Sequence, residues 1–438
     1  MNVRPSEWNK YLLGSVLFAS LLIGGGTASG LYTDTLIEVA AFVSSAALFS
    51  QTSGQRIPRS VLWLIIFAVA LVILQIVPLP AAMFKGLRPE LLLADPWLGE
   101  TRFRFVSVGV GRTIECLMYL AASAAFFLSV LRLRTEQVQA LLPFFFMGVI
   151  CNGLAGAIQY SLSDDIAING LLPFTIYAGL FANQNHFSAL LFVSIPFVVY
   201  YGLFRGNLLS GSLGLVALLL LLLAAGSRAG VLIGLAITVL SIIFLSSRSR
   251  ASGFGVLAIF IGLSVYTIGV WTKIETEVVD PAFGRGEFAR TTIEGIKDNW
   301  VTGIGFGNFQ KAYQIYENEG MIFSKYVNHA HNDYLEIAFE GGVLAALLMA
   351  LYFVLLFVSF ARIRRDPLQK AAFLAVSFLL IHSLVDYPLR TEALAMTFAF
   401  MNAIIFHKGF GDRLAQKSET IEIDHNGDKL FVPIGKSS

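Results

Sequence analysis

The chain has 438 residues, of which 56% are hydrophobic, only 14% are charged, and 37 are phenylalanine. Soluble domains carry roughly 45–50% apolar and about 25% charged residues, so this composition excludes a soluble enzyme, a DNA-binding module and a disordered protein. The formal net charge of +2 is close to neutral and indicates no polyanionic partner, so we expect no binding to nucleic acid. The composition predicts an all-α polytopic integral membrane protein, whose solvent is the lipid bilayer.

Apolar runs separated by charged residues predict about twelve transmembrane helices, since each crossing needs roughly 20 apolar residues. They lie near residues 11–30, 34–50, 60–78, 111–131, 138–160, 183–203, 208–225, 229–246, 254–271, 333–361, 370–386 and 391–407. The first run also fits a cleaved secretory signal, because basic residues precede it and small residues follow it. Gly24 to Gly26 and the next span fit a retained helix equally well, and we expect the first helix to be retained.

Lysine and arginine residues set the expected orientation, because they concentrate in cytoplasmic connections. Placing both termini in the cytoplasm puts most of these residues on the inner side. The chain then divides into residues 1–271 with nine helices, a large outer loop at 272–332, three helices at 333–407 and a polar cytoplasmic tail at 408–438. Among the short outer connections, only those at Arg228 and Arg390 carry cations, which invites a functional explanation for both residues.

The large outer loop is expected to contain short helices. Residues 286–300 predict an amphipathic helix, with Phe288 and Ile296 on or near its apolar face and Arg285 and Arg290 available elsewhere. The run from Gly303 to Gly307 then breaks the pattern. Such a run can also bind phosphate, but it follows a helix instead of a strand and lies outside the cell, so a plain turn is the favoured interpretation.

Polar side chains gather at the outer ends of the predicted helices. Charged groups near lipid are costly unless they pair or face a wet cavity, so the gathering predicts an outward-facing site. Its candidate members are Asn185, His186, Arg228, Arg285, Arg290, His329, His331, Asn332, Asp386 and Arg390.

Each of these residues also has a structural interpretation. Arg228 could cap a helix end or reach toward lipid headgroups, and Arg390 could pair with Asp386 or Glu392. Asn185 and His186 could form a helix cap with an interfacial ring.

The segment from His329 to Asp333 allows two kinds of chemistry. Alternating histidines can bind zinc, but a third ligand is not evident, so we expect no metal and no other cofactor. Alternatively, one histidine is a general base oriented by the adjacent Asn332 or Asp333. A base surrounded by arginines suits attack of a sugar hydroxyl on an anomeric carbon that carries a lipid diphosphate, because arginine binds diphosphate oxygens at two points.

Four segments together resemble the O-antigen ligase and polymerase superfamily of bacterial membrane glycosyltransferases. They are Ala182-Asn183-Gln184-Asn185-His186-Phe187, Ser227-Arg228-Ala229, His329-Ala330-His331-Asn332-Asp333-Tyr334-Leu335-Glu336 leading to Gly341-Gly342, and Asp386-Tyr387-Pro388-Leu389-Arg390. The resemblance covers about residues 183–407 by motif and the whole chain by its pattern of spans.

The resemblance implies a GT-C-like fold in the bacterial inner membrane and a metal-independent, inverting glycosyltransferase. The implied donor is a glycan on undecaprenyl diphosphate at the periplasmic face. His331 matches the family's base because Asn332 and Gly342 hold the family's spacing, whereas His329 does not. Arg228 and either Arg285 or Arg290 match the arginines that bind diphosphate.

The acceptor is not defined by a motif. A lipid A-core hydroxyl would make the protein a ligase, and a growing surface polysaccharide would make it a repeat-unit polymerase; protein O-glycosylation is a third choice. Ala345 departs from the ligase pattern, which favours Gly, Thr or Tyr there. A secondary transporter or flippase is the alternative from another class, and it would place ionisable or helix-breaking residues near the bilayer midplane in two corresponding halves.

Overall fold

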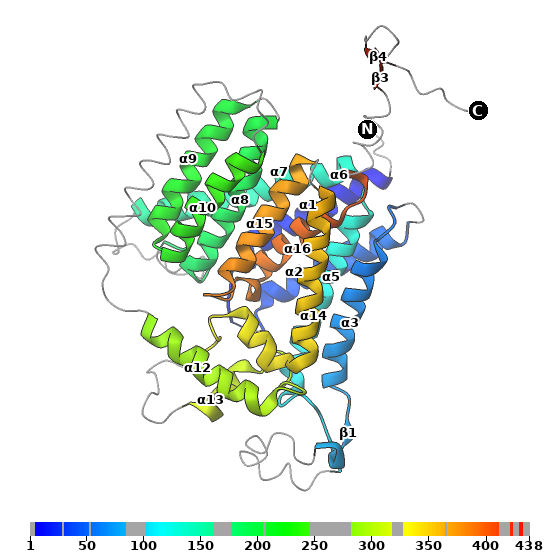
Figure 1. Cartoon of the computed structure of the whole chain (residues 1–438), viewed down its shortest axis with the longest axis vertical. Helices are drawn as coiled ribbons and strands as arrows, with labels where there is room; N and C mark the ends of the chain where they lie inside the picture. The colour runs from blue at the N-terminus through cyan, green and yellow to red at the C-terminus, as the bar shows by residue number, and fades with distance from the viewer. Residues whose placement is uncertain are drawn as a thin grey trace, which may run out of the picture.

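The computed structural model describes residues 5–28, 30–51, 54–84, 102–161, 177–204, 207–245, 282–317, 327–363, 366–410, 421–423 and 429–431. These residues form an α-helical protein with two short antiparallel strand pairs (Figure 1). Strand β1 (Leu79–Pro80) pairs with β2 (Phe103–Arg104), and β3 (Ile421–Ile423) pairs with β4 (Lys429–Phe431). The expectation of an all-α fold is confirmed.

The described helices lie close to the predicted apolar runs, except that the first begins and ends several residues before the predicted run at 11–30. In chain order they are α1 (Pro5–Ile23), α2 (Tyr32–Phe49), α3 (Arg59–Gln75), η1 (Ala81–Phe84), α5 (Val110–Arg132), α6 (Thr135–Gln139), α7 (Leu142–Ser161), α8 (Gln184–Phe204), α9 (Leu208–Ala225), α10 (Arg228–Leu245), α12 (Ala282–Asn299), α13 (Phe309–Tyr316), α14 (Asp333–Ile363), α15 (Pro367–His382), η4 (Pro388–Arg390) and α16 (Glu392–Phe406).

Within the described ranges, 7 helical segments are long and apolar enough to cross a membrane. They are residues 32–49, 110–132, 135–161, 184–204, 208–225, 228–245 and 333–361. Shorter apolar helices occupy 59–75, 367–382 and 392–406. The predicted span at 254–271 lies outside the described residues, so the total of about twelve stays a prediction.

Helix α8 lies at the centre of the bundle, where it packs against α9, α10 and α15. Its consecutive residues Leu190, Leu191 and Phe192 are each 0% exposed. Because consecutive side chains of a helix point in different directions, their burial means that neighbours cover every face of α8. In the first turn of α8, His186 and Phe187 are also buried, whereas Gln184 is exposed.

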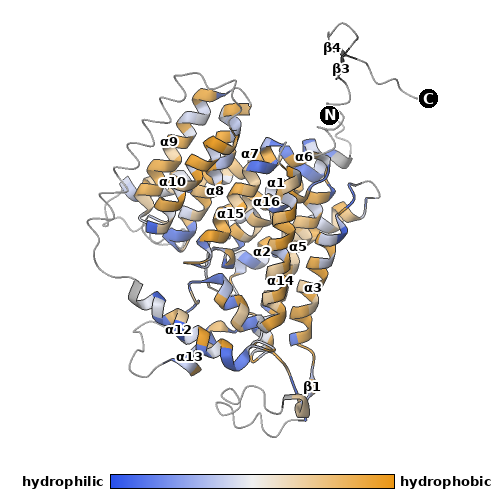
Figure 2. Ribbon diagram, in the orientation of Figure 1, coloured by the Kyte–Doolittle hydropathy of each residue, from blue (hydrophilic) through white to orange (hydrophobic). Residues whose placement is uncertain are grey.

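The outer faces of the bundle are apolar, as a bilayer requires (Figure 2). Helix α14 exposes one row of large apolar side chains beyond its first turns: Leu344, Leu347, Leu351, Val354 and Phe357. Hydrophilic residues gather at the ends of the bundle and on parts of α12 and α13.

Helices α12 and α13 lie at the end of the molecule opposite α6 (Figure 1). They pack on the first turns of α14 through a second, smaller hydrophobic core, which contains Ile304, Phe309, Ala312, Tyr313, Val327, Ala330 and Phe339. The amphipathic helix predicted at 286–300 is confirmed as α12. Its apolar face covers this small core with Phe288 and Ile296.

The glycine run after α12 forms the predicted turn. Gly303 has φ +67°, and a Cβ there would collide with the backbone of Glu340. The turn comes this close because Ile304 N donates to Phe339 O at 3.1 Å and Gly305 N donates to Glu340 O at 2.9 Å. Helix α14 itself breaks at Gly342, where φ is +62° and ψ is −156°. The first turns of α14 are thus a separate polar helix that rests on the loop.

Candidate active site

Two chain segments far apart in sequence meet at the start of α14. Asp333 N donates to Ser383 O at 3.0 Å, and Ser383 Oγ donates to Asp333 Oδ2 at 2.8 Å. Asn332 Nδ2 donates to Leu384 O at 2.9 Å. These bonds hold the histidine segment before α14 against the corner between α15 and η4.

Asn332 also caps α14. Its Oδ1 accepts hydrogen bonds from Tyr334 N and Leu335 N, each at 3.0 Å, which satisfies two amides that a helix start leaves unpaired. His331 immediately precedes this cap and has φ +51°, a left-handed conformation that costs a non-glycine residue roughly 1–2 kcal/mol. The cap and the corner therefore hold His331 in a strained position, as is common at functional sites.

The Asp386 carboxylate lies at the centre of the cluster and is 1% exposed. Its Oδ1 lies 3.4 Å from His331 Nδ1 and 3.9 Å from His186 Nε2, and it accepts a 2.9 Å hydrogen bond from Tyr387 N. Burial alone would raise the pKa of Asp386. Contact with His331 and the proximity of His186 and His382 lower this pKa by more, to below the usual range for aspartate, so the group is ionised at neutral pH.

The second oxygen of Asp386 faces two other elements. Asn185 Nδ2, in the first turn of α8, donates a short hydrogen bond to Oδ2. Arg285 Nη2, in α12, lies 3.6 Å from the same oxygen, and its side chain is 41% exposed. Asp386 therefore joins α8, α12 and the histidine segment at one point.

The two candidate loop arginines differ in their surroundings. Arg285 reaches Asp386, whereas Arg290 pairs with Glu287 of its own helix at 3.0 Å and is 71% exposed. Arg285 is thus the loop arginine that the structure brings to His331 and Asp386.

Arg228 begins α10, two residues after Gly226, which caps the end of α9 with φ +81°. A Cβ on Gly230 would collide with Ser188, so the first turn of α10 packs against the first turns of α8. Because that part of α8 carries Asn185, Arg228 starts a helix that borders the Asp386 cluster.

Two buried histidines lie behind Asp386. His186 and His382 are each 0% exposed, and neither ring nitrogen of either has a hydrogen-bond partner among the described residues. The His186 ring meets Tyr387 edge-on at 4.8 Å, and the His382 ring meets Phe192 edge-on at 5.4 Å. Buried polar groups normally have hydrogen-bond partners, so these two imidazoles make the interior beside Asp386 a polar region within the apolar bundle.

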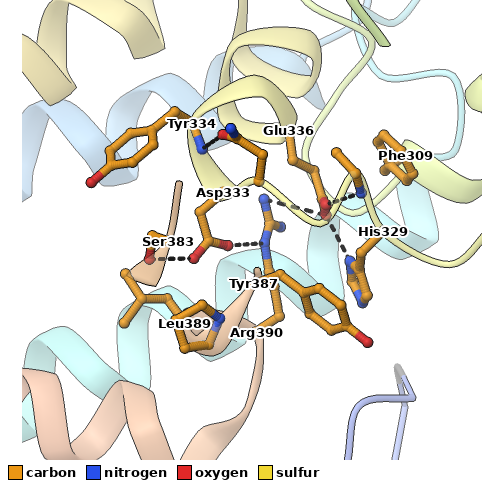
Figure 3. Close-up of polar contacts among 12 residues, drawn as sticks. Phe309, His329, Asp333, Tyr334, Glu336, Ser383, Tyr387, Leu389 and Arg390 are labelled. Atoms are coloured by element: carbon orange, nitrogen blue, oxygen red, sulfur yellow. Dashed lines mark hydrogen bonds and ion pairs between the residues drawn. The ribbon is translucent and has the colours of Figure 1, made fainter. Parts of the chain in front are cut away.

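Arg390 is surrounded by carboxylates of α14 (Figure 3). Its guanidinium lies 3.6 Å from Asp333, 3.4 Å from Glu336 and 3.0 Å from Glu340, and its side chain is 17% exposed. The expected partners, Asp386 and Glu392, are not among these contacts. The reason is helical spacing, because positions 333, 336 and 340 fall on one face of α14 and present their carboxylates together.

His329 belongs to this carboxylate cluster. Its Nδ1 lies 2.8 Å from Glu336, and its ring stacks on Tyr387 with 4.2 Å between centroids. Burial alone would lower the pKa of His329, but the Glu336 carboxylate raises it by more. Burial alone would also lower the pKa of Arg390, yet the surrounding carboxylates raise it well above its ordinary value. Both groups therefore serve as counter-charges to buried acids.

The glycine turn binds the last carboxylate of this cluster. Glu340 Oε1 accepts hydrogen bonds from Gly307 N at 2.8 Å and from Phe309 N at 3.2 Å. The amides of the turn thus form an anion-binding nest, as in a phosphate loop, but the anion is a carboxylate of the chain itself.

Sequence reasoning missed several members of the site. The carboxylates of Glu336 and Glu340 could have been recognised from their spacing relative to Asp333. Phe288 and Tyr387, whose rings contact His331, carry no such signal, because their contacts join segments distant in sequence. Among the described residues, no three His, Cys, Asp or Glu side chains gather in a way that would hold a metal ion.

The apolar bundle, with polar side chains gathered at its ends, defines a multi-pass membrane protein. Residues 213–350 match the family model described as O-antigen ligase. This match confirms the resemblance found in the sequence and assigns this part of the chain to the O-antigen ligase superfamily. No curated protein sequence matches the chain.

The matched segment contains some of the candidate site residues. It includes Arg228, Arg285, Arg290, His329, His331 and Asn332, whereas Asn185, His186, Asp386 and Arg390 lie outside it.

Proposed function

We propose that this protein is a glycosyltransferase of the bacterial inner membrane that moves a glycan from undecaprenyl diphosphate to an acceptor hydroxyl at the periplasmic face. The juxtaposition of His331, Asp386 and Arg285 carries the proposal, because three separate elements supply a base, an ionised partner and a cation. The family match supports the same class of reaction.

His331 is the proposed general base. Its Nδ1 faces the Asp386 carboxylate at 3.4 Å, which leaves Nε2 to accept the proton of the acceptor hydroxyl. The ionised Asp386 then stabilises the imidazolium that forms. The distance is long for a hydrogen bond, as is usual before substrate binds.

Arg285 and Arg228 are the proposed ligands of the diphosphate. A guanidinium binds phosphate oxygens at two points and stays charged, so it stabilises the negative charge that develops on the leaving group. Arg285 is suited to this role because its side chain is 41% exposed and close to the proposed base. Arg290 is not assigned a role, because it pairs with Glu287 instead.

The remaining candidates are proposed to shape the site. Arg390 and His329 neutralise the carboxylates of α14 and so hold the segment that carries His331. Asn332 fixes the same segment by capping the helix, whereas Asn185 and His186 position Asp386.

The proposed reaction needs no metal. The acceptor oxygen forms a bond to the anomeric carbon while the bond between that carbon and the phosphate oxygen breaks. The electron pair of the broken bond leaves with the lipid diphosphate, and the hydroxyl proton moves to His331. Attack opposite the leaving group inverts the anomeric configuration. We also propose that the chain has a GT-C-like fold with about twelve spans. Nine spans lie in residues 1–271 and three in residues 333–407, with the periplasmic loop at 272–332 and the cytoplasmic tail at 408–438.

The matched family is described as O-antigen ligase, so we propose ligation, with lipid A-core as the acceptor and a growing surface polysaccharide as the alternative. Both acceptors use the same chemistry, so the experiment must distinguish them by the product that accumulates.

A deletion strain complemented with wild type or with His331→Ala tests the proposal by analysis of its surface glycan. Membrane levels of both proteins serve as the control. With His331→Ala we expect high-molecular-weight surface glycan to disappear while lipid-linked polymer accumulates. Accumulation of single repeat units only would assign the polymerase reaction. Full complementation by His331→Ala would show that His331 is not the base and would favour the alternative of a transporter or flippase.

A further inference from the structure

The contact with Asp386 does not fully fix the ring of His331. Its backbone is left-handed, and its nearest carboxylate oxygen is 3.4 Å away, so the imidazole could turn about its side-chain bonds without losing a strong hydrogen bond. A general base must present its nitrogen in one direction, and a small misplacement is enough to slow proton transfer. Other contacts must therefore orient the ring.

Two aromatic rings contact the imidazole. Phe288 lies almost parallel to it, with 5.6 Å between centroids and 27° between planes. Tyr387 meets it edge-on at 4.9 Å and 79°. The stacked ring limits rotation of His331 about its last side-chain bond, and the edge-on ring limits sideways movement.

Phe288 is itself held in place. Its ring meets Tyr313 of α13 edge-on at 6.4 Å, and its side chain packs against the small core beneath α12. Arg285 lies three positions earlier, on the same side of α12. One helical turn of α12 therefore contacts both the proposed general base and its carboxylate partner. Arg285 reaches Asp386, and Phe288 covers His331.

An aromatic face also affects the charge of the ring it covers. When His331 takes a proton it becomes a cation, and the negative face of Phe288 attracts that cation. The other ionisable groups around His331 are Asp386, Arg285, His186 and Tyr387. Asp386 favours the cation, Arg285 and His186 both lie near Asp386, and the Tyr387 ring contacts both His331 and His329. Phe288, which does not ionise, acts on His331 through its ring face, whereas Tyr387 meets His331 edge-on.

We infer that Phe288 is a positioning residue for His331, which holds the imidazole in its productive orientation and favours its protonated form during the reaction. The inference rests on the proposed function, since it concerns the base of that reaction. It also explains how docking of α12 completes the site, because a single helix supplies the diphosphate ligand and the support for the base.

The test uses the full-length protein in lipid vesicles with a lipid-diphosphate-linked glycan and an acceptor, and it measures kcat, the donor KM and their pH profiles. Phe288→Leu removes the ring face but keeps most of the volume, whereas Phe288→Tyr keeps the face. Ile296→Ala is the matched control, because it loosens the same small core from the same helix without touching His331. His331→Ala reports the proposed reaction itself.

We expect Phe288→Leu to lower kcat about tenfold with little change in donor KM, because it affects the base and not the diphosphate. The acid limb of its kcat profile should move to lower pH, since loss of the ring face lowers the proton affinity of His331. Phe288→Tyr should restore both values, and Ile296→Ala should leave the profile in place.

Several outcomes would overturn the inference. A Phe288→Leu enzyme with the wild-type kcat and profile would do so, as would equal losses in the leucine and tyrosine variants. A profile shift in Ile296→Ala would show that loosening of α12 alone explains the effect. An inactive wild type or a fully active His331→Ala would instead contradict the proposed function, so the two failures are distinguishable.

Discussion

Asp386 brings together residues that no local motif connects. Its carboxylate contacts Asn185 and His186 of α8, Arg285 of α12 and His331 before α14. A buried carboxylate normally needs such partners, because an isolated charge in an apolar interior is unstable. The same contacts that stabilise Asp386 therefore assemble the proposed site.

The two arginines of α12 provide a matched pair for testing the diphosphate ligand. Arg285→Ala should lower kcat/KM by roughly tenfold to a hundredfold, since it removes charge-assisted hydrogen bonds to the donor. Arg290→Ala should stay within about twofold of wild type, because its exposed pair with Glu287 contributes little. Steady-state transfer assays on both variants provide the measurement. Equal losses, or a larger loss for Arg290→Ala, would contradict the assignment.

Arg390 should act on stability more than on donor binding. Arg390→Ala would leave the carboxylates of Asp333, Glu336 and Glu340 without their shared cation, a loss typically of about 3–5 kcal/mol for a broken buried pair. We expect a lower melting temperature in detergent and poor membrane levels, with partial recovery in Arg390→Lys. A variant that melts like wild type but binds the donor poorly would instead make Arg390 a substrate ligand.

Residue types could be predicted from the sequence better than their partners. Histidines, arginines and Asp386 stood out because polar groups at helix ends are costly near lipid. The partners expected for Arg390, Asp386 or Glu392, differ from those it has, because its partners depend on which face α14 presents to the η4 turn. The contact of Phe288 with His331 was likewise hidden, since an aromatic residue on an amphipathic helix is equally typical of a hydrophobic core.

At the level of elements, the break in α14 decides how the polar helix meets the loop. Gly342 has φ +62° and ψ −156°, a combination that only glycine adopts readily, and Gly303 N would lie 2.6 Å from a Cβ at this position. The break lets residues 333–341 leave the direction of the membrane span and rest on the turn at 303–307.

Gly342→Ala should therefore destabilise the protein by at least about 1–3 kcal/mol, from backbone strain alone. Thermal unfolding in detergent should show a clear fall in melting temperature, accompanied by loss of transfer activity. Gly111→Ala is the control, because a Cβ at Gly111 meets nothing within 4 Å. An unchanged melting temperature for Gly342→Ala would mean that α14 does not need this break.

Helix α12 and the glycine turn were both predictable, because an amphipathic period and a glycine run are local signals. What the turn binds was not predictable. Its amides contact Glu340, which lies 33 residues after Gly307 in the sequence, and only the folded chain brings the two together.

For the whole molecule, the central expectation is orientation. The basic residues beside α6 predict a cytoplasmic position, and α12 lies at the opposite end of the molecule (Figure 1). In a background with Cys116 and Cys151 replaced by Ser, a membrane-impermeant maleimide should label Asp298→Cys in intact spheroplasts. Glu136→Cys should react only after the membrane is permeabilised. The reverse pattern would place His331 in the cytoplasm and contradict a periplasmic reaction.

The sequence predicted the class of the molecule from composition alone, because lipid imposes apolar surfaces on every span. The number of spans is harder to predict. Several described helices, such as α15 and α16, are shorter than a full crossing, and apolar periodicity cannot separate such helices from complete spans.

Transfer by the purified protein tests the proposed function most directly. Wild type and His331→Ala would each be reconstituted in vesicles with a lipid-diphosphate-linked glycan and lipid A-core, without added metal and with a chelator present. Wild type should form glycosylated lipid A-core and release lipid diphosphate, whereas His331→Ala should form neither despite the same melting temperature. Absence of product with wild type, or equal product with both proteins, would contradict glycosyl transfer by His331.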